Sequence, residues 1–185
     1  MEVINPDERC LYCFSADISV KTQVCQSCFK KSQLIHRMAA AFDDQGPAFD
    51  LLREFKNGKY YLAKSLASSL VLQWYALDWP FPDCIVPVPS TFSRWFQRGC
   101  NPRALLAKEL GKLLRCSVSY ALKRTSYQTD APQFRLRSST ALGDRTVLLV
   151  DDLYVTGRTL RSAAETLRGA SPQRIYGLTF SRAMR

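Results

Sequence analysis

The sequence lacks any apolar run near the 18 or so residues that a membrane-spanning helix needs. Its first ten residues, MEVINPDERC, are polar and acidic and lack the apolar stretch of a secretory signal. From these absences we expect no membrane span and no signal peptide, and therefore a cytoplasmic protein. Histidine is nearly absent: His36 is the only one, and we interpret it as a linker residue. A length of 185 residues predicts one ordinary domain with room for a small appendage.

The net charge of +10 is unevenly distributed. Residues 1–35 carry four basic and four acidic side chains, so the whole excess lies in residues 36–185. Within that part, residues 89–137 hold ten Lys and Arg against two acids. Such a segment suits an anionic ligand, either pyrophosphate or a nucleic-acid backbone. A solvated basic surface is the alternative.

Four of the seven cysteines form the pattern C-x2-C-x11-C-x2-C, made by Cys10, Cys13, Cys25 and Cys28. Two such pairs match a structural zinc site with four thiolate ligands and no position left for a substrate. Residues 1–35 have few large apolar side chains, so we expect them to need a cross-link in order to fold. A bound zinc ion supplies that cross-link. Two disulfides are the alternative, and the missing signal peptide argues against them.

The most informative stretch is Val147 to Thr159, VLLVDDLYVTGRT. Four apolar residues predict a buried strand, Asp151 and Asp152 follow, and a Thr/Gly turn leads into a helix over residues 160–167. This arrangement forms phosphate sites at the carboxyl end of a sheet, because turn amides and the helix N-terminus bind the anion. The carboxylates suit a pair of sugar hydroxyls or a Mg²⁺ ion. The alternative is an ordinary turn with two solvated aspartates.

The rest of the chain alternates between helices and strands. We expect a linker and a short helix over residues 34–58, helices over 59–77 and 101–115, and strands over 84–88, 118–122 and 174–181. Residues 123–140 have no helical or strand period and predict a long functional or mobile loop. This alternation predicts an α/β domain with a mostly parallel sheet.

The motif around Asp151 resembles the site of type I phosphoribosyltransferases for 5-phosphoribosyl-1-pyrophosphate (PRPP). With the cysteine pairs, the segment DCIVPVP at residues 83–89 and RGCN at 98–101, the chain resembles the ComF family, which includes late-competence and GntX-like proteins. The resemblance implies a type I phosphoribosyltransferase-like fold, with a mostly parallel sheet flanked by helices, in residues 36–185. It also implies a small zinc ribbon in residues 1–35.

The resemblance assigns roles by position. It makes Asp151 and Asp152 catalytic residues that hold the ribose hydroxyls, with Mg²⁺ carried by PRPP. It implies that the residues binding the 5′-phosphate are Tyr154, Val155, Thr156, Gly157, Arg158 and Thr159. It places the pyrophosphate loop at Pro87, Val88, Pro89 and Ser90, followed by Arg98. Residues 123–140 would form a lid over the bound ligand. Val155, Arg158, Cys100 and Pro102 depart from the usual family pattern.

The leading hypothesis is a PRPP-binding protein of the ComF type that acts in DNA uptake during natural transformation. If it is an enzyme, it transfers phosphoribosyl to an acceptor that the sequence does not identify. The alternative is a single-stranded DNA-binding competence module whose PRPP site is regulatory or vestigial. Its DNA-binding candidates are Arg94, Trp95, Lys123, Arg124, Arg135 and Arg137. A weaker hypothesis is an adaptor whose ribbon recruits a helicase-like competence protein.

Overall fold

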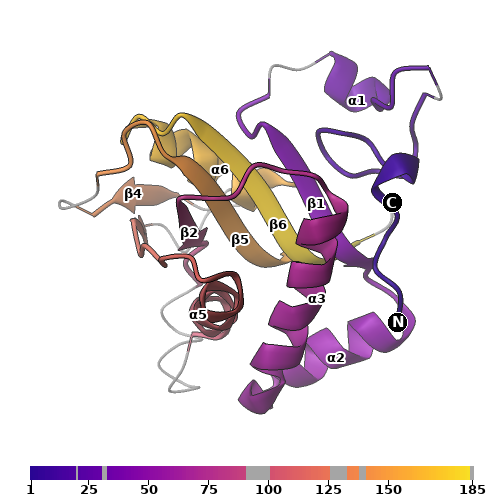
Figure 1. The fold of residues 1–185 in the computed structure, drawn as a ribbon, viewed down its shortest axis with the longest axis horizontal. Coiled ribbons are helices and arrows are strands. Elements are labelled where there is room, and N and C mark those ends of the chain that lie inside the picture. The colour runs from indigo at the N-terminus through magenta and orange to yellow at the C-terminus, as the bar shows by residue number, and fades with distance from the viewer. Residues whose placement is uncertain (20, 31–32, 91–100, 126–132, 138–140, 184–185) are drawn as a thin grey trace.

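The computed structural model describes residues 1–19, 21–30, 33–90, 101–125, 133–137 and 141–183. Its centre is a sheet of four strands in the order β1-β6-β5-β2 (Figure 1). All neighbouring strands run parallel, which confirms the predicted mostly parallel sheet. The strands are β1 (Arg37–Asp43), β2 (Cys84–Pro87), β5 (Thr146–Tyr154) and β6 (Arg174–Arg182).

Helices cover both faces of this sheet (Figure 1). One face packs against α2 (Gly46–Lys56), α3 (Ala63–Ala76) and α5 (Pro102–Leu114). The other packs against α6 (Arg158–Arg168) and a hairpin of β3 (Leu122–Arg124) and β4 (Phe134–Leu136). Side chains of β5 alternate between the two cores: Leu148 and Val150 join the first, and Val147 and Leu149 join the second.

The N-terminal module contains two short helical turns, η1 (Pro6–Glu8) and α1 (Gln26–Phe29), and the four paired cysteines. Two contacts attach it to β1. The backbone N–H of Ile4 donates to the carbonyl of Ala41 at 2.9 Å, and Arg9 Nη2 lies 2.7 Å from Asp43 Oδ2. The division of the chain at residue 35 stays a prediction.

Three local expectations were wrong. Residues 37–43, which fall in the expected linker, form the edge strand β1, whose middle five residues are buried. The three alanines in β1 have low β-propensity, so its strand signal is weak. The expected loop at 123–140 contains β4 and the end of β3, and the expected strand at 118–122 contributes an isolated bridge between Val118 and Ile85.

The remaining elements follow the sequence more closely. Asn101 caps α5, since its side-chain oxygen accepts from the backbone N–H groups of Arg103 and Ala104 at 3.2 and 3.3 Å. A further helical turn, η2 (Tyr60–Leu62), precedes α3. Among the described residues, no helix has both the length and the apolar content that a membrane crossing requires.

Candidate functional site

The four paired cysteines converge on one point. The sulfur atoms of Cys10, Cys13, Cys25 and Cys28 all lie within 4.8 Å of one another, and those of Cys13 and Cys25 are 3.6 Å apart. All four are free thiols, so the disulfide alternative has no support in the structure. Hydrogen bonds from Cys13 and then Cys28 hold the pKa of Cys10 well below its usual range, whereas hydrogen bonds with Cys10 raise the pKa of Cys13 to about 12 and also raise that of Cys28. Four sulfurs at this spacing fit a tetrahedral zinc ion.

The two predicted acids lie at the carboxyl end of β5, inside the strand. Asp151 is 1% exposed and Asp152 is 5% exposed. The guanidinium of Arg103, in the first turn of α5, contacts both acids: Nε lies 2.7 Å from Asp151 Oδ1, and Nη2 lies 3.2 Å from Asp152 Oδ1. From α2, Lys56 Nζ lies 3.3 Å from Asp152 Oδ2. The acids are therefore a buried, cation-bridged pair and not two solvated aspartates.

Burial acts against the charged form of both acids, but the result differs between them. Burial raises the pKa of Asp151 to about 8, although Arg103 opposes the rise. At Asp152, Arg103 and Lys56 outweigh burial and hold the pKa well below its usual range. The shifts are therefore opposite in direction: the Asp151 carboxyl binds a proton more readily than the Asp152 carboxyl does.

Sequence reasoning missed Arg103 and Lys56 as parts of this site. Arg103 follows Asn101-Pro102, a helix start, and comes soon after a strand that was correctly placed. Because the carboxyl ends of parallel strands meet at one edge, this position could have been linked to the end of β5. Lys56 lies at the end of α2, and the sequence carries no comparable signal for it.

The predicted phosphate turn follows β5 directly. Residues 155–157 bend the chain, and α6 begins at Arg158. Gly157 has φ +74°, and a Cβ at this position would lie 2.6 Å from Tyr154 Oη, so the turn requires glycine. Thr156 is exposed, and its hydroxyl accepts from the Arg158 amide at 3.3 Å. The first-turn amides of a helix have no intrahelical acceptor, so this turn has the geometry for an anion.

The expected pyrophosphate loop begins beside the acids. Strand β2 pairs with β5 so that Pro87 lies opposite Val150, and the Val88 amide donates to the Val150 carbonyl at 2.9 Å. Strand β2 is the last strand of the four-stranded sheet, with an isolated bridge from Ile85 to Val118 beyond it, and proline is tolerated at such a sheet edge. Pro89 and Ser90 follow, half-buried. Arg94, Trp95 and Arg98 lie outside the described residues.

Four DNA-binding candidates lie on the β3–β4 hairpin or beside it: Lys123, Arg124, Arg135 and Arg137. Lys123 and Arg135 are cross-strand partners, and both are exposed. Arg124 lies over the ring of Phe134, 6.0 Å from its centroid. Like charges directly opposite each other destabilise a hairpin, so an anion bound there would relieve the repulsion.

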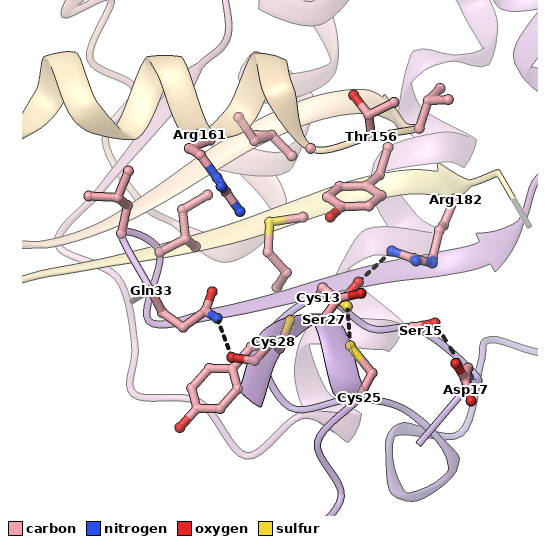
Figure 2. Close-up of a pocket in the computed structure, with 18 residues that line it drawn as sticks. Cys13, Ser15, Asp17, Cys25, Ser27, Cys28, Gln33, Thr156, Arg161 and Arg182 are labelled. Carbon is pink, nitrogen blue, oxygen red and sulfur yellow. Dashed lines mark hydrogen bonds between the residues drawn. The ribbon is translucent and has the colours of Figure 1, made fainter. Parts of the chain in front are cut away.

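A cavity of about 360 Å³ lies between the phosphate turn and the cysteine module (Figure 2). Its walls include Thr156, Gly157 and Arg161 on one side and Cys28, Ser27 and Gln33 on the other. The acids do not line it. This cavity therefore lies next to the turn and the cysteine module, and the acids lie outside it.

Comparison with known proteins agrees with the expected family. The model of the phosphoribosyl transferase domain matches residues 98–181, which contain the acids, the turn and α6. Competence protein F of Haemophilus influenzae is 26% identical over 193 residues, which cover 91% of this chain and 83% of that protein. These two matches, with the cysteine cluster, confirm the predicted ComF-type relationship.

Solved structures give weaker likenesses. A purine phosphoribosyltransferase from Pyrococcus horikoshii has a TM-score of 0.43 and 21% identity, with 64% of this chain and 68% of that chain covered. The UMP synthase of Leishmania donovani has a TM-score of 0.45 and 13% identity, with 73% of this chain and 32% of that chain covered. The fold assignment therefore depends on the sheet itself and on the family match.

Proposed function

We propose that this chain, a relative of competence protein F in which residues 98–181 match the phosphoribosyl transferase domain, binds PRPP at the carboxyl end of β5. One observation carries the proposal: a buried pair of carboxylates, Asp151 and Asp152, leads through Tyr154 directly into a glycine turn at the start of α6. The acids suit the ribose hydroxyls and the turn suits the 5′-phosphate, so one ligand that carries both groups fits the two features together.

The other residues around the acids then have positional roles. Arg103 and Lys56 hold the carboxylates in place before the ligand arrives, which limits the reorganisation that binding requires. Val88 and Ser90, beside the same strand end, would receive the pyrophosphate. Magnesium bound with PRPP would neutralise pyrophosphate charge. The acids and the main chain around Ser90 offer oxygen ligands of the kind this ion prefers.

Transfer, if it occurs, breaks the bond between C1 of the ribose and the pyrophosphate oxygen. The acceptor forms the new bond to C1 and loses a proton, and pyrophosphate leaves with the bonding electron pair. The buried acid pair would keep the ribose in position while positive charge develops at C1. Exclusion of water from the site would protect that carbon from hydrolysis.

Calorimetry with Mg²⁺ and PRPP tests the proposal on the wild type and on Asp152→Asn. Asn keeps the shape of the side chain and removes its charge, so we expect PRPP affinity to fall by about tenfold or more, as for loss of one charged contact. The control is Asp50→Asn, a substitution of the same kind on the exposed face of α2. Equal affinities for all three proteins would exclude this site.

We also propose a second function, binding of single-stranded DNA at the β3–β4 hairpin. The exposed cross-strand pair Lys123 and Arg135 favours it, because phosphate would remove their repulsion. The double substitution Lys123→Gln/Arg135→Gln should make the slope of log affinity against log salt concentration less steep, by the equivalent of about two phosphate contacts. Lys64→Gln on α3 is the control, and an unchanged salt slope in the double variant would exclude the hairpin.

A further inference from the structure

Arg182, the last residue of β6, lies between the cysteine module and the phosphate turn. Strand β6 pairs with β1 on one side and with β5 on the other, and Arg182 lies opposite Asp43 and Tyr154. The Asp44 amide donates to the Arg182 carbonyl at 2.7 Å, and the Ala183 amide donates to the Tyr154 carbonyl at 2.8 Å. The sheet therefore fixes the backbone at this position, and the side chain extends from a defined point at the carboxyl end of the strands.

The guanidinium of Arg182 makes one contact in each direction. It donates to the Cys13 carbonyl, a bond that Figure 2 draws as a dashed line. Its central carbon lies 4.6 Å from the centroid of the Tyr154 ring, within the roughly 6 Å of a cation–π contact. In the described part of the chain, no carboxylate forms an ion pair with it. The known partners of this charge are thus a carbonyl of the cysteine module and a ring beside the turn.

The Tyr154 ring packs in turn against the phosphate turn. A Cβ at Gly157 would lie 2.6 Å from Tyr154 Oη and 3.0 Å from two ring carbons, so the ring and the turn are in close contact. The Gly157 carbonyl accepts from the Arg161 amide at 2.9 Å, a hydrogen bond at the start of α6. A displaced ring would therefore disturb both the turn and the first turn of the helix.

On the other side, Cys13 belongs to the four-sulfur cluster. Its sulfur lies 3.6 Å from that of Cys25, and all four sulfurs lie within 4.8 Å of one another. The same residue thus offers a sulfur to a metal ion and a carbonyl to Arg182. A zinc ion bound by the sulfurs would fix the backbone of Cys13 and with it the acceptor of the Arg182 hydrogen bond. Without the ion, only packing and hydrogen bonds hold this carbonyl in place.

We propose that Arg182 is a positioning residue that couples the cysteine module to the phosphate turn, so that zinc held by the cysteines stabilises the turn in the conformation that binds a phosphate group. The part of this inference that concerns the ligand rests on the proposed function. The link between the module and the turn does not. Coupling between two sites is reciprocal, so PRPP must raise the affinity for zinc by the factor by which zinc raises the affinity for PRPP.

Hydrogen–deuterium exchange of the ligand-free protein tests the link without PRPP. Removal of zinc under reducing conditions should speed amide exchange in residues 154–164 by about threefold or more, as for loss of one cation–π contact. In Arg182→Met these amides should exchange faster by a similar factor even with zinc bound, and removal of zinc should add little. Arg174→Met, at the other end of β6, is the control and should behave as the wild type. Exchange in α5, residues 102–114, should stay within about twofold throughout.

A second measurement follows the reciprocal effect. Competition for zinc with a zinc-selective chelator, with and without saturating Mg²⁺ and PRPP, should show that PRPP raises the zinc affinity about threefold in the wild type and in Arg174→Met. In Arg182→Met this factor should fall close to one, although both zinc and PRPP still bind. A role of Arg182 in the stability of the module alone would lower the zinc affinity but leave the factor unchanged. Arg182→Gln, which also removes the charge over the ring, is a second variant and should give the same results.

Three results would overturn the inference. One is exchange in residues 154–164 that does not respond to zinc in the wild type. Another is exchange that rises equally in α5. The third is an effect of PRPP on zinc affinity that persists in both variants of Arg182. A wild-type protein that binds no PRPP in calorimetry would instead refute the proposed function, and the exchange experiment would still decide whether Arg182 links the module to the turn.

Discussion

Replacement of Arg103 by methionine should destabilise the protein strongly, although Arg103 is not part of the hydrophobic core. Its guanidinium lies 2.7 Å from Asp151 and 3.2 Å from Asp152, and these carboxylates are 1% and 5% exposed. Methionine fills a similar volume but leaves two adjacent buried carboxylates with Lys56 as their remaining cation among the described ion pairs.

The magnitude follows from the cost of leaving a buried charge unpaired, which is about 3–5 kcal/mol in the free energy of unfolding. The site can reduce this cost by taking up a proton, which becomes easier as the pH falls. We therefore expect a loss of about 3 kcal/mol or more at pH 8 and a smaller loss at pH 5. Lys108→Gln, on the exposed face of α5, removes the same charge from the same helix and should cost about 0.5 kcal/mol at most.

Urea unfolding, followed by the fluorescence of the buried Trp74 and Trp79, measures these differences at both pH values. The double variant Arg103→Met/Asp151→Asn should recover part of the loss, because it removes one of the unpaired carboxyls. A loss below about 1 kcal/mol for Arg103→Met, or a loss equal to that of Lys108→Gln, would refute the view that the acids depend on this guanidinium.

Three further predictions concern other parts of the molecule. Gln73 is fully buried, and neither polar atom of its side chain has a hydrogen-bond partner among the described residues, so Gln73→Met should raise the free energy of unfolding by about 1–2 kcal/mol in urea titrations; a lower value would contradict this. Burial raises the pKa of Asp151 to about 8, so the contribution of this carboxyl to the free energy of unfolding is full below about pH 4 and is lost as the pH rises through about 8. Between pH 5 and 9, the urea midpoint of Asp151→Asn should therefore fall less than the urea midpoint of the wild type. Equal falls would refute this account. The purified protein should contain about one zinc ion per chain by metal assay, and Cys13→Ser should lower this to under half; a folded wild-type protein without metal would oppose the zinc assignment.

The phosphate turn and the cysteine module could be predicted because both depend on short local patterns. Gly157 needs a positive φ and has no room for a Cβ, so the residue type itself reveals the turn. The paired spacing of Cys10, Cys13, Cys25 and Cys28 likewise specifies a cluster without knowledge of the fold. Such signals survive in a single sequence.

Other features depend on packing between distant segments. Strand β1 has three alanines and becomes a strand because β6 pairs along it. Arg103 and Lys56 contact Asp152 from 49 and 96 residues earlier in the chain, and no local pattern connects them. The cavity between the turn and the cysteine module is lined by segments far apart in the chain, among them Cys13 and Arg182, which are hydrogen-bonded across a separation of 169 residues. Long-range contacts of this kind need the structure.

A crystal structure of the protein with Mg²⁺ and PRPP tests the central proposal most directly. The 5′-phosphate should lie on residues 155–159, and the ribose hydroxyls should lie within hydrogen-bond distance of the carboxylates of Asp151 and Asp152. PRPP bound elsewhere on the protein, or a ribose that contacts neither carboxylate, would contradict the account.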